Sequence, residues 1–177
     1  YDNYPDLVDK DMSRKKLNIT ELNVILFFGL VRHYKGLDRL ILSMEKVFKN
    51  NQNIKLLIAG ECYKNKEKYL AMIKDSKYSD KIFWKEEYIP DEDISIYFCA
   101  SDLVVLPYRS ASQSGVVPLA YHYNKPVITS DLESLREVVD IGKTGFVFNS
   151  NEKDSLSATI LNFFENYNES YYKNNIE

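Results

Sequence analysis

Short apolar runs alternate with amphipathic segments along most of the chain. Uninterrupted apolar runs predict buried strands over residues 23–29, 54–60, 81–85, 102–107, 125–129 and 145–148. Between them, apolar residues recur three and four positions apart, which predicts helices over residues 36–49, 64–76, 90–100, 114–123, 132–139 and 152–167. Strands that are apolar on both faces and alternate with helices are typical of a parallel sheet covered by helices. The pattern therefore predicts an α/β fold with about six parallel strands and helices on both faces.

Two flanking segments lie outside this alternation. Residues 1–22 predict a linker with a short helix near residues 13–17, and residues 168–177, rich in Asn, Tyr and Glu, predict a frayed tail. Residues 23–167 then form one domain, and a chain of 177 residues is long enough to bury an independent core. Because the sequence does not begin with Met, we expect it to be part of a longer protein.

Composition and charge narrow the classes of function. The net charge of −3 argues against a nucleic-acid-binding surface, which needs an excess of Lys and Arg on one face. The sequence has no apolar run of about 18 residues, so we expect no transmembrane segment, and its polar start is unlike a signal peptide. Cys62 and Cys99 have no paired spacing, which favours reduced thiols and a cytoplasmic location.

The loop after the first predicted strand is a candidate anion site. Glycines bracket it at Gly29 and Gly36, and it carries Arg32 and Lys35, three positions apart. In open α/β sheets ligands bind beyond the carboxyl ends of the strands, where a guanidinium and an ammonium could share one anion. His33 lies in the same loop and is expected near the ligand. The alternative is that these are solvated surface charges, but the glycine bracket favours a site.

A second candidate is the loop after the fourth predicted strand. It is small and polar, it runs directly into a predicted helix, and Gly115 allows close approach of a ligand to the backbone. The free N–H groups of a first helical turn favour phosphate, although a serine here also suits an ordinary helix cap. Both roles are compatible. The candidate ligand-binding residues of this loop are Ser112, Gln113, Ser114, Gly115, Val116 and Val117.

Other sequence patterns are weaker indicators of a functional site. The motifs G-x-x-x-x-G-K-[ST], G-x-G-x-x-G and G-x-S-x-G are absent, which disfavours P-loop, dinucleotide-binding and α/β-hydrolase sites. His33 and His122 lack metal-ligand spacing, so we expect no metal site. The acids of Asp91–Asp93 are explained by the positive end of a helix dipole, and the loop 60–62 is interpreted as a surface turn.

Several segments, by their order and spacing along the chain, resemble the C-terminal domain of the glycosyl transferases group 1 family. The two-domain fold of this family is called GT-B. The resemblance extends from about Asn23 to Glu165. The segments that carry it are Phe27–Gly36, Leu57–Gly60, Tyr88–Glu92, Ala100–Pro107, Gly115–Leu119, Lys125–Thr129 and Glu137–Phe146.

The resemblance implies a Rossmann-like domain that holds a nucleoside-diphosphate sugar. Lys35, assisted by Arg32, would stabilise the leaving diphosphate together with the backbone amides near Gly115. The segment Glu87, Tyr88 and Ile89 would hold the base, largely through its main chain. No metal or other cofactor is implied. Transfer with retention, to a glycan or lipid-linked glycan, would require a missing N-terminal domain, which is also the part that would associate with the inner face of a membrane.

The sequence departs from the family at two positions. Relatives often carry two glutamates eight positions apart, and counting from Gly115 these fall on Ser112 and Ala120. We interpret the chain as a variant subgroup in which Gln113 or Glu133 takes over part of the role. Two alternatives stay open: a non-catalytic relative that acts as an interaction module, and a nucleotide-sugar epimerase.

Overall fold

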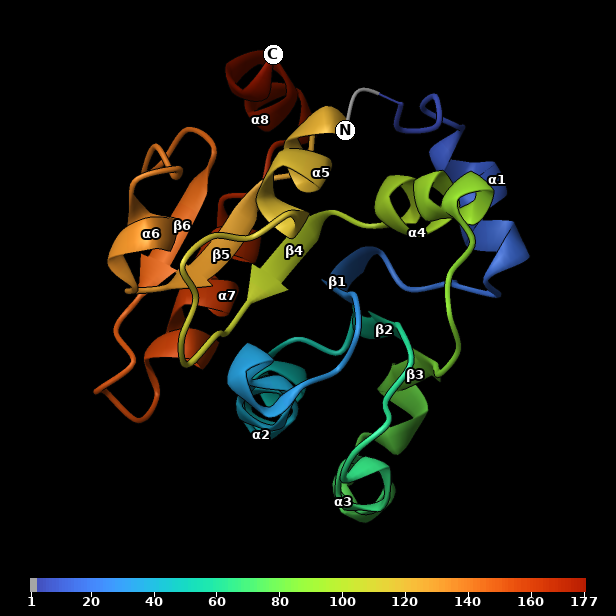
Figure 1. Ribbon diagram of the computed structural model, residues 1–177, viewed down its shortest axis with the longest axis vertical. Coiled ribbons are helices and arrows are strands. Elements are labelled where there is room, and N and C mark those ends of the chain that lie inside the picture. The colour runs from blue at the N-terminus through green and yellow to red at the C-terminus, as the bar shows by residue number, and fades with distance from the viewer. Residues whose placement is uncertain (1–2) are drawn as a thin grey trace.

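In the computed structural model, which describes residues 3–177, six strands form one fully parallel sheet in the order β3-β2-β1-β4-β5-β6 (Figure 1). The strands are β1 (Asn23–Phe28), β2 (Ile54–Ala59), β3 (Ile82–Lys85), β4 (Leu103–Leu106), β5 (Val127–Ser130) and β6 (Gly145–Phe148). The longer helices are α1 (Lys10–Lys16), α2 (Leu37–Asn50), α3 (Lys66–Asp75), α4 (Ile94–Ala100), α5 (Val116–His122), α6 (Glu133–Arg136), α7 (Ser155–Glu165) and α8 (Glu169–Ile176). The predicted α/β class is confirmed. Residues 1 and 2 of the predicted linker lie outside the described residues.

Both faces of the sheet are buried. Along β1, Ile25 and Phe27 belong to the apolar cluster that includes α2 and α7, while Val24 and Leu26 belong to the cluster that includes α4 and α5. All four side chains are at most 1% exposed. Figure 1 shows α2, α3 and α7 on one side of the sheet and α1, α4 and α5 on the other. This burial explains why the strands are continuous apolar runs without polar alternation.

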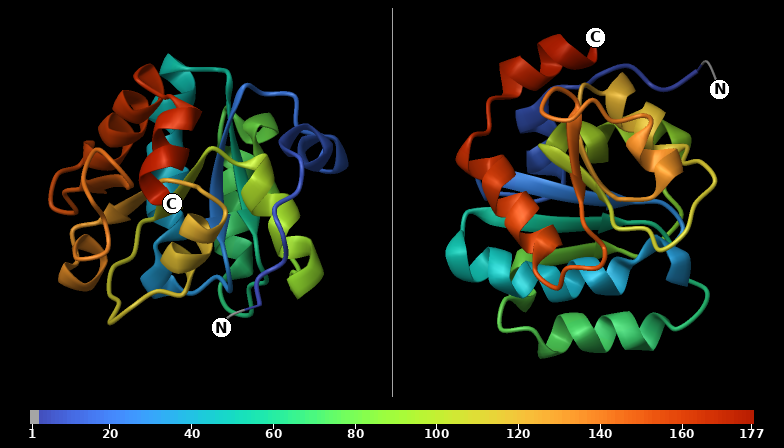
Figure 2. Two further views of the ribbon diagram at one scale, coloured as in Figure 1. Left: turned by 90° about the horizontal axis from the view of Figure 1, so that it is seen from above. Right: turned by 90° about the vertical axis from the view of Figure 1, so that its left-hand side faces the viewer.

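A buried carboxylate ties the two ends of the described chain to the sheet. Asp102, at the start of β4, is 1% exposed and accepts from Lys10 Nζ at 2.6 Å and Arg14 Nη2 at 2.7 Å. The backbone N–H of Val24 donates to it at 2.8 Å, and the hydroxyl of Tyr167 donates at 3.1 Å. In the right-hand view of Figure 2, the segment before α1 and helix α8 lie on the same side of the molecule. The segments before β1 and after α7 are therefore anchored at one point.

The predicted frayed tail is wrong, because residues Glu169–Ile176 form helix α8. The side chain of Asn168 accepts a hydrogen bond from the backbone N–H of Tyr171 and caps the helix. Tyr172 is buried, with its ring centroid 5.2 Å from that of Phe163 in α7. The polar composition of the tail concealed this aromatic contact, which depends on where α7 lies.

Several predicted boundaries also differ. The predicted helix over residues 90–100 begins as a 3-10 turn, Asp91–Asp93, before α4. Helix α5 begins at Val116 instead of residue 114, and α6 is only four residues long. The predicted short helix near residues 13–17 starts earlier, where the side chain of Asp9 accepts from the backbone N–H of Met12.

Candidate functional site

The two loops predicted to bind an anion follow neighbouring strands. Strand β1 pairs with β2 on one side and β4 on the other, so the chain changes direction across the sheet between β1 and β4. Ligands of open α/β sheets bind at such a switch point, beyond the carboxyl ends of the strands. The loop 29–36 follows β1 and the loop 107–115 follows β4, and both therefore lie at this edge of the sheet.

Lys35 folds back over the end of β1. Its Nζ lies 3.0 Å from the place that a Cβ on Gly29 would occupy, and Gly29 has a φ of +111°. Any side chain at this position would therefore be strained and would displace the ammonium group. Burial, followed by the nearby charge of Arg32, lowers the pKa of Lys35 from 10.5. Arg32 itself is exposed, so the loop presents one half-buried cation and one solvated cation.

The loop 29–36 is attached to the segment that follows β4. Gly36 has a φ of +72°, and a Cβ there would lie 2.0 Å from the carbonyl oxygen of Pro107. The backbone N–H of Arg109 donates to the carbonyl of Tyr34 at 2.6 Å, and its guanidinium binds the carboxylate of Asp38 through two bonds of 2.8 and 2.7 Å. Glycine at position 36 is therefore needed for the two loops to pack closely. The charge of Arg109 is already paired with Asp38.

His33 is exposed, and its carbonyl oxygen accepts from Arg109 Nη1 at 2.9 Å. The backbone of His33 thus belongs to the contact between the two loops, while its imidazole is open to solvent.

Two adjoining cavities, together called the crevice, lie at the switch point. The first has a volume of about 380 Å³ and the second about 520 Å³. The first cavity is lined by Phe28, Gly29, Leu30, Ala59, Gly60, Glu61, Tyr88, Ile89, Asp91 and Ile94. The second is lined by Tyr4, Pro5, Asp91, Ile94, Gly115, Pro118 and Leu119. Gly29 and Gly115, from the two predicted loops, therefore line adjoining parts of the crevice.

The turn at Gly115 forms the α5 side of the crevice. Gly115 has an ordinary helical backbone conformation, and a Cβ there would meet no atom within 4 Å. The fold therefore does not require glycine at this position, in contrast to Gly29 and Gly36. The hydroxyl of Ser114 accepts from the backbone N–H of Val116 at 3.2 Å, so this amide is already capped. Val117 is buried in the core, and only its backbone is available to a ligand.

The remaining residues of this loop make fewer contacts with the rest of the protein. Ser112 and Gln113 are exposed, and Ser114 is half-buried. Burial raises the pKa of Tyr108 to about 12, and the nearby hydroxyl of Ser114 partly opposes this effect. On α5, Ala120 is fully buried, whereas Leu119 lines the crevice. No carboxylate of α5 therefore reaches the crevice.

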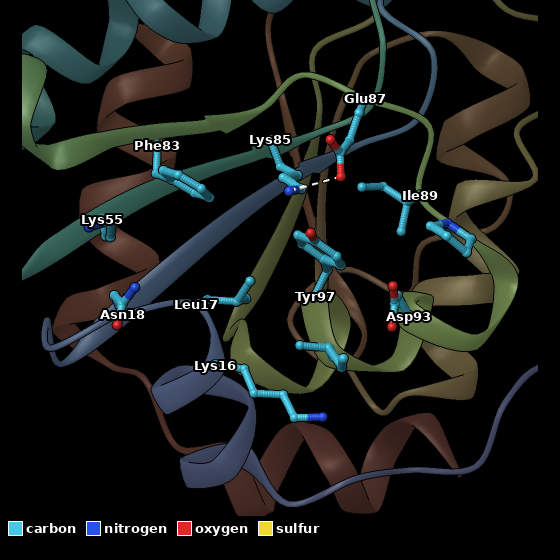
Figure 3. A pocket seen from close by; sticks show the side chains of 12 residues that line it. Lys16, Leu17, Asn18, Lys55, Phe83, Lys85, Glu87, Ile89, Asp93 and Tyr97 are labelled. Atoms are coloured by element: carbon cyan, nitrogen blue, oxygen red, sulfur yellow. Dashed lines mark ion pairs between the residues drawn. The ribbon is translucent and has the colours of Figure 1, made fainter.

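The predicted base-binding segment is divided between two cavities. Tyr88 and Ile89 line the crevice, but the carboxylate of Glu87 lies 2.8 Å from Lys85 Nζ in a separate hollow beside β3 (Figure 3). The hollow is lined by Lys16, Leu17, Asn18, Lys55, Phe83, Lys85, Glu87, Ile89, Pro90, Asp93, Ile96 and Tyr97. The side chain of Glu87 thus points away from the crevice, while the main chain of the segment remains beside it.

Three contributions to the crevice differ from the main sequence interpretation. The loop 60–62, interpreted as a surface turn, supplies Gly60 and Glu61 to the first cavity. Asp91 lines both cavities, although its position at the start of a helix suggested only a dipole effect. Tyr4 and Pro5 line the second cavity, held there by a bond from the Tyr123 hydroxyl to the carbonyl of Pro5 at 2.8 Å. The position of Asp91 directly after the predicted base-binding segment was the available signal. Nothing in the sequence placed the N-terminal segment at this edge.

Residues 3–177 contain no group of three or more His, Cys, Asp or Glu side chains arranged to hold a metal ion. Cys62 and Cys99 are both buried as free thiols. None of the described helices is sufficiently long and apolar to cross a membrane. The crevice is lined by apolar side chains, backbone groups and the acidic residues Glu61 and Asp91, while Arg32 and Lys35 belong to the adjoining loop and are outside this lining.

The sequence model for "Glycosyl transferases group 1" matches residues 9–176. A GDP-mannose:glycolipid 4-beta-D-mannosyltransferase of Xanthomonas campestris pv. campestris is 32% identical over 127 residues, which are 70% of this chain and 35% of that protein. The chain spans little more than a third of the length of the curated relatives it matches.

Solved structures show the same fold. Anabaena Alr3699/HepE, in complex with UDP and glucose, superposes with a TM-score of 0.83 at 19% identity, over 98% of this chain and 47% of that one. The C-terminal domain of the glycosyl transferase group 1 family protein LpcC of Francisella tularensis superposes with a TM-score of 0.82 at 15% identity. The match covers 98% of this chain and 89% of that one. The chain therefore has the architecture of such a C-terminal domain.

Proposed function

Because the chain belongs to the glycosyl transferases group 1 family, we propose that it is the donor-binding half of a glycosyltransferase that acts on a nucleoside-diphosphate sugar. The acceptor, a glycan or lipid-linked glycan, binds to a second domain, and transfer proceeds with retention. The mannosyltransferase relative is named for a GDP-mannose donor, and the HepE structure contains UDP, so both bases are candidates.

The observation that carries this proposal is the position of Lys35. Its half-buried ammonium lies on Gly29 at the end of β1, while Gly115 lines the crevice from the α5 side without a fold-imposed need for glycine. Lys35 lies beside the crevice, next to Gly29, which lines it. A diphosphate bound near Gly29 and reaching toward Gly115 would receive a positive charge from Lys35 and backbone N–H groups from the Gly115 turn. The same groups would stabilise the charge that develops on the leaving diphosphate.

Burial of Lys35 has a cost that a ligand would offset. A desolvated ammonium is destabilised relative to one in water unless an anion lies close to it. No carboxylate within residues 3–177 forms an ion pair with Lys35. A bound diphosphate is the natural counter-ion, and Arg32 would add a second, solvent-exposed contact.

The first prediction concerns these cations. Calorimetric titration of the 177-residue chain with UDP, GDP, UDP-glucose and GDP-mannose should show binding of at least one nucleotide. Lys35→Ala should weaken that binding by about tenfold to a hundredfold, as expected for a lost charge-assisted hydrogen bond, and Arg32→Ala by less because it is exposed. Lys74→Ala, which removes an exposed lysine from α3, is the matched control and should leave the affinity unchanged.

If Lys35→Ala and Arg32→Ala bind the nucleotide as tightly as the unmodified chain, the diphosphate site is elsewhere. Absence of any nucleotide binding, together with neither hydrolysis nor transfer by the full-length protein, would favour the non-catalytic interaction module. The stereochemical proposal is tested separately by NMR of the glycosidic product. A β-linked product from an α-configured donor would contradict retention. The mannosyltransferase relative is named for a β linkage, which from an α-configured donor is inversion, so the proposal takes retention from the family resemblance and not from this relative.

A further inference from the structure

Asp91 holds an unusual position in the crevice. It is the first residue of the 3-10 turn before α4, and it lines both cavities. Ile94 is the other residue that they share. A ligand that occupies both cavities must therefore pass Asp91.

The carboxylate of Asp91 is also unengaged. Within residues 3–177 it forms neither an ion pair nor a side-chain hydrogen bond, and it is exposed. The other acids near the site are either paired or confined to one cavity. Asp38 binds Arg109 through two bonds, Glu87 pairs with Lys85 at 2.8 Å, and Glu61 lines the first cavity but not the second.

The surroundings of Asp91 differ between the two cavities. The first has a flat apolar and aromatic wall from Phe28, Tyr88 and Ile89, which suits a nucleobase. The second reaches Gly115 on α5. In a nucleoside diphosphate, the ribose connects the base to the phosphates. A base in the first cavity and phosphates near Gly115 therefore place the ribose beside the shared wall.

A carboxylate is the appropriate group at that point. The ribose presents two neighbouring hydroxyls that donate hydrogen bonds, and an ionised carboxylate only accepts them, with two oxygens. In dinucleotide-binding folds an acidic side chain binds a ribose hydroxyl in this way. The α5 side of the crevice offers no such acceptor, because Leu119 lines it and Ala120 is buried.

From the shared wall, the free carboxylate and the apolar α5, we infer that Asp91 binds the ribose diol of the donor nucleotide, from the wall opposite α5. This inference rests on the proposed function, since it assumes that a nucleoside diphosphate occupies the crevice. It makes Asp91 a donor-binding residue and requires no acidic side chain at Ser112 or Ala120.

The second prediction tests Asp91 by removing its carboxylate from the protein and the two ribose hydroxyls from the nucleotide, separately and together. Calorimetry compares UDP with 2′,3′-dideoxy-UDP, and GDP with 2′,3′-dideoxy-GDP, on the unmodified chain and on Asp91→Ala. The unmodified chain should bind the dideoxy nucleotide about tenfold or more weakly, because two charge-assisted hydrogen bonds are lost. Asp91→Ala should bind the two forms equally. The ratio cancels any general effect of removing a negative charge near the diphosphate.

Asp93→Ala is the matched control. Asp93 belongs to the same turn but lines the hollow beside β3, where Figure 3 shows it near Tyr97. This variant should keep the preference of the unmodified chain for the ribose form. Asp91→Asn provides a second test variant of nearly equal size, and thermal unfolding of all three variants checks that they fold.

The outcomes separate the two proposals. If the unmodified chain binds a nucleotide but does not distinguish ribose from dideoxyribose, or if Asp91→Ala still distinguishes them, the role of Asp91 is overturned and the donor site stands. If the unmodified chain binds neither UDP nor GDP, the proposed function fails and the role of Asp91 fails with it.

Discussion

At the scale of single residues, the proposed site depends on a cation that the fold holds in a poorly hydrated place. Lys35 lies on Gly29, and burial lowers its pKa, with a further contribution from Arg32. A folded-state pKa below the unfolded value means that the unfolded chain binds more protons between the two values. The Lys35 ammonium therefore reduces stability at neutral pH, and this cost disappears as the pH rises through its folded pKa. The residue is suited to binding more than to stability.

A third prediction follows for the pH dependence of binding. Only protonated Lys35 attracts a diphosphate, so nucleotide affinity should decline as the pH rises through the lowered pKa, beginning below 10.5. Lys35→Arg keeps its charge throughout this range and should lack that part of the decline. The measurement is the nucleotide Kd of both proteins between pH 7 and 10. Titration of the nucleotide itself is common to both curves, so their difference isolates Lys35, and parallel curves would contradict its contact with the diphosphate.

At the scale of elements, Asp102 connects three parts of the chain that are distant in sequence. It accepts from Lys10 and Arg14 of α1, from the backbone of β1 and from Tyr167 beyond α7. Burial and the carboxylate of Asp102 both raise the pKa of Tyr167, so its hydroxyl stays protonated and donates. The network anchors α1, and the segment before it is held separately by the bond from the Tyr123 hydroxyl to the carbonyl of Pro5, which lines the crevice with Tyr4.

The fourth prediction is that Asp102→Asn destabilises the protein strongly. It leaves two cations next to a buried neutral amide, and loss of one partner of a buried ion pair costs about 3–5 kcal/mol. In a domain of this size the Tm should fall by about 10 °C, as measured by circular dichroism. Asp140→Asn is the control, because Asp140 forms an exposed pair with Lys143 at 3.4 Å, and its change should be within about 0.5 kcal/mol. A similar Tm for both variants would contradict the anchoring role of Asp102.

At the scale of the whole molecule, the chain spans only part of the length of its relatives. It covers 47% of the HepE chain but 89% of the isolated LpcC domain, so its fold corresponds to that C-terminal domain. Under the proposed function, a second domain would complete the site. Both domains would then be needed for transfer, because positioning of donor and acceptor supplies much of the rate enhancement.

The fifth prediction is therefore that the 177-residue chain binds donor without turning it over. Incubation with GDP-mannose or UDP-glucose should release no nucleoside diphosphate above the uncatalysed rate, even at concentrations where calorimetry shows binding. Release should appear with the full-length protein and an acceptor. Catalytic release by the 177-residue chain alone would show that one domain contains the complete active site.

The sequence by itself determined the sheet and the two loops that border its switch point. The apolar runs predict all six strands because each strand is buried on both faces, as Ile25 and Val24 illustrate. The glycine bracket and cations of residues 29–36 are local signals, and the left-handed backbone of Gly29 and Gly36 explains that bracket.

The tertiary structure alone decided which side chains share the crevice. Asp91 and Glu87 are four positions apart, yet one lines the crevice and the other turns to Lys85, because the turn after Ile89 directs them to different sides of the chain. The composition of the segment around Tyr172 predicted a frayed tail, whereas the structure has a helix there. The sequence could not reveal this because the burial of Tyr172 depends on its contact with α7. Local periodicity reports the burial of an element, but contacts between distant segments depend on how the elements pack together.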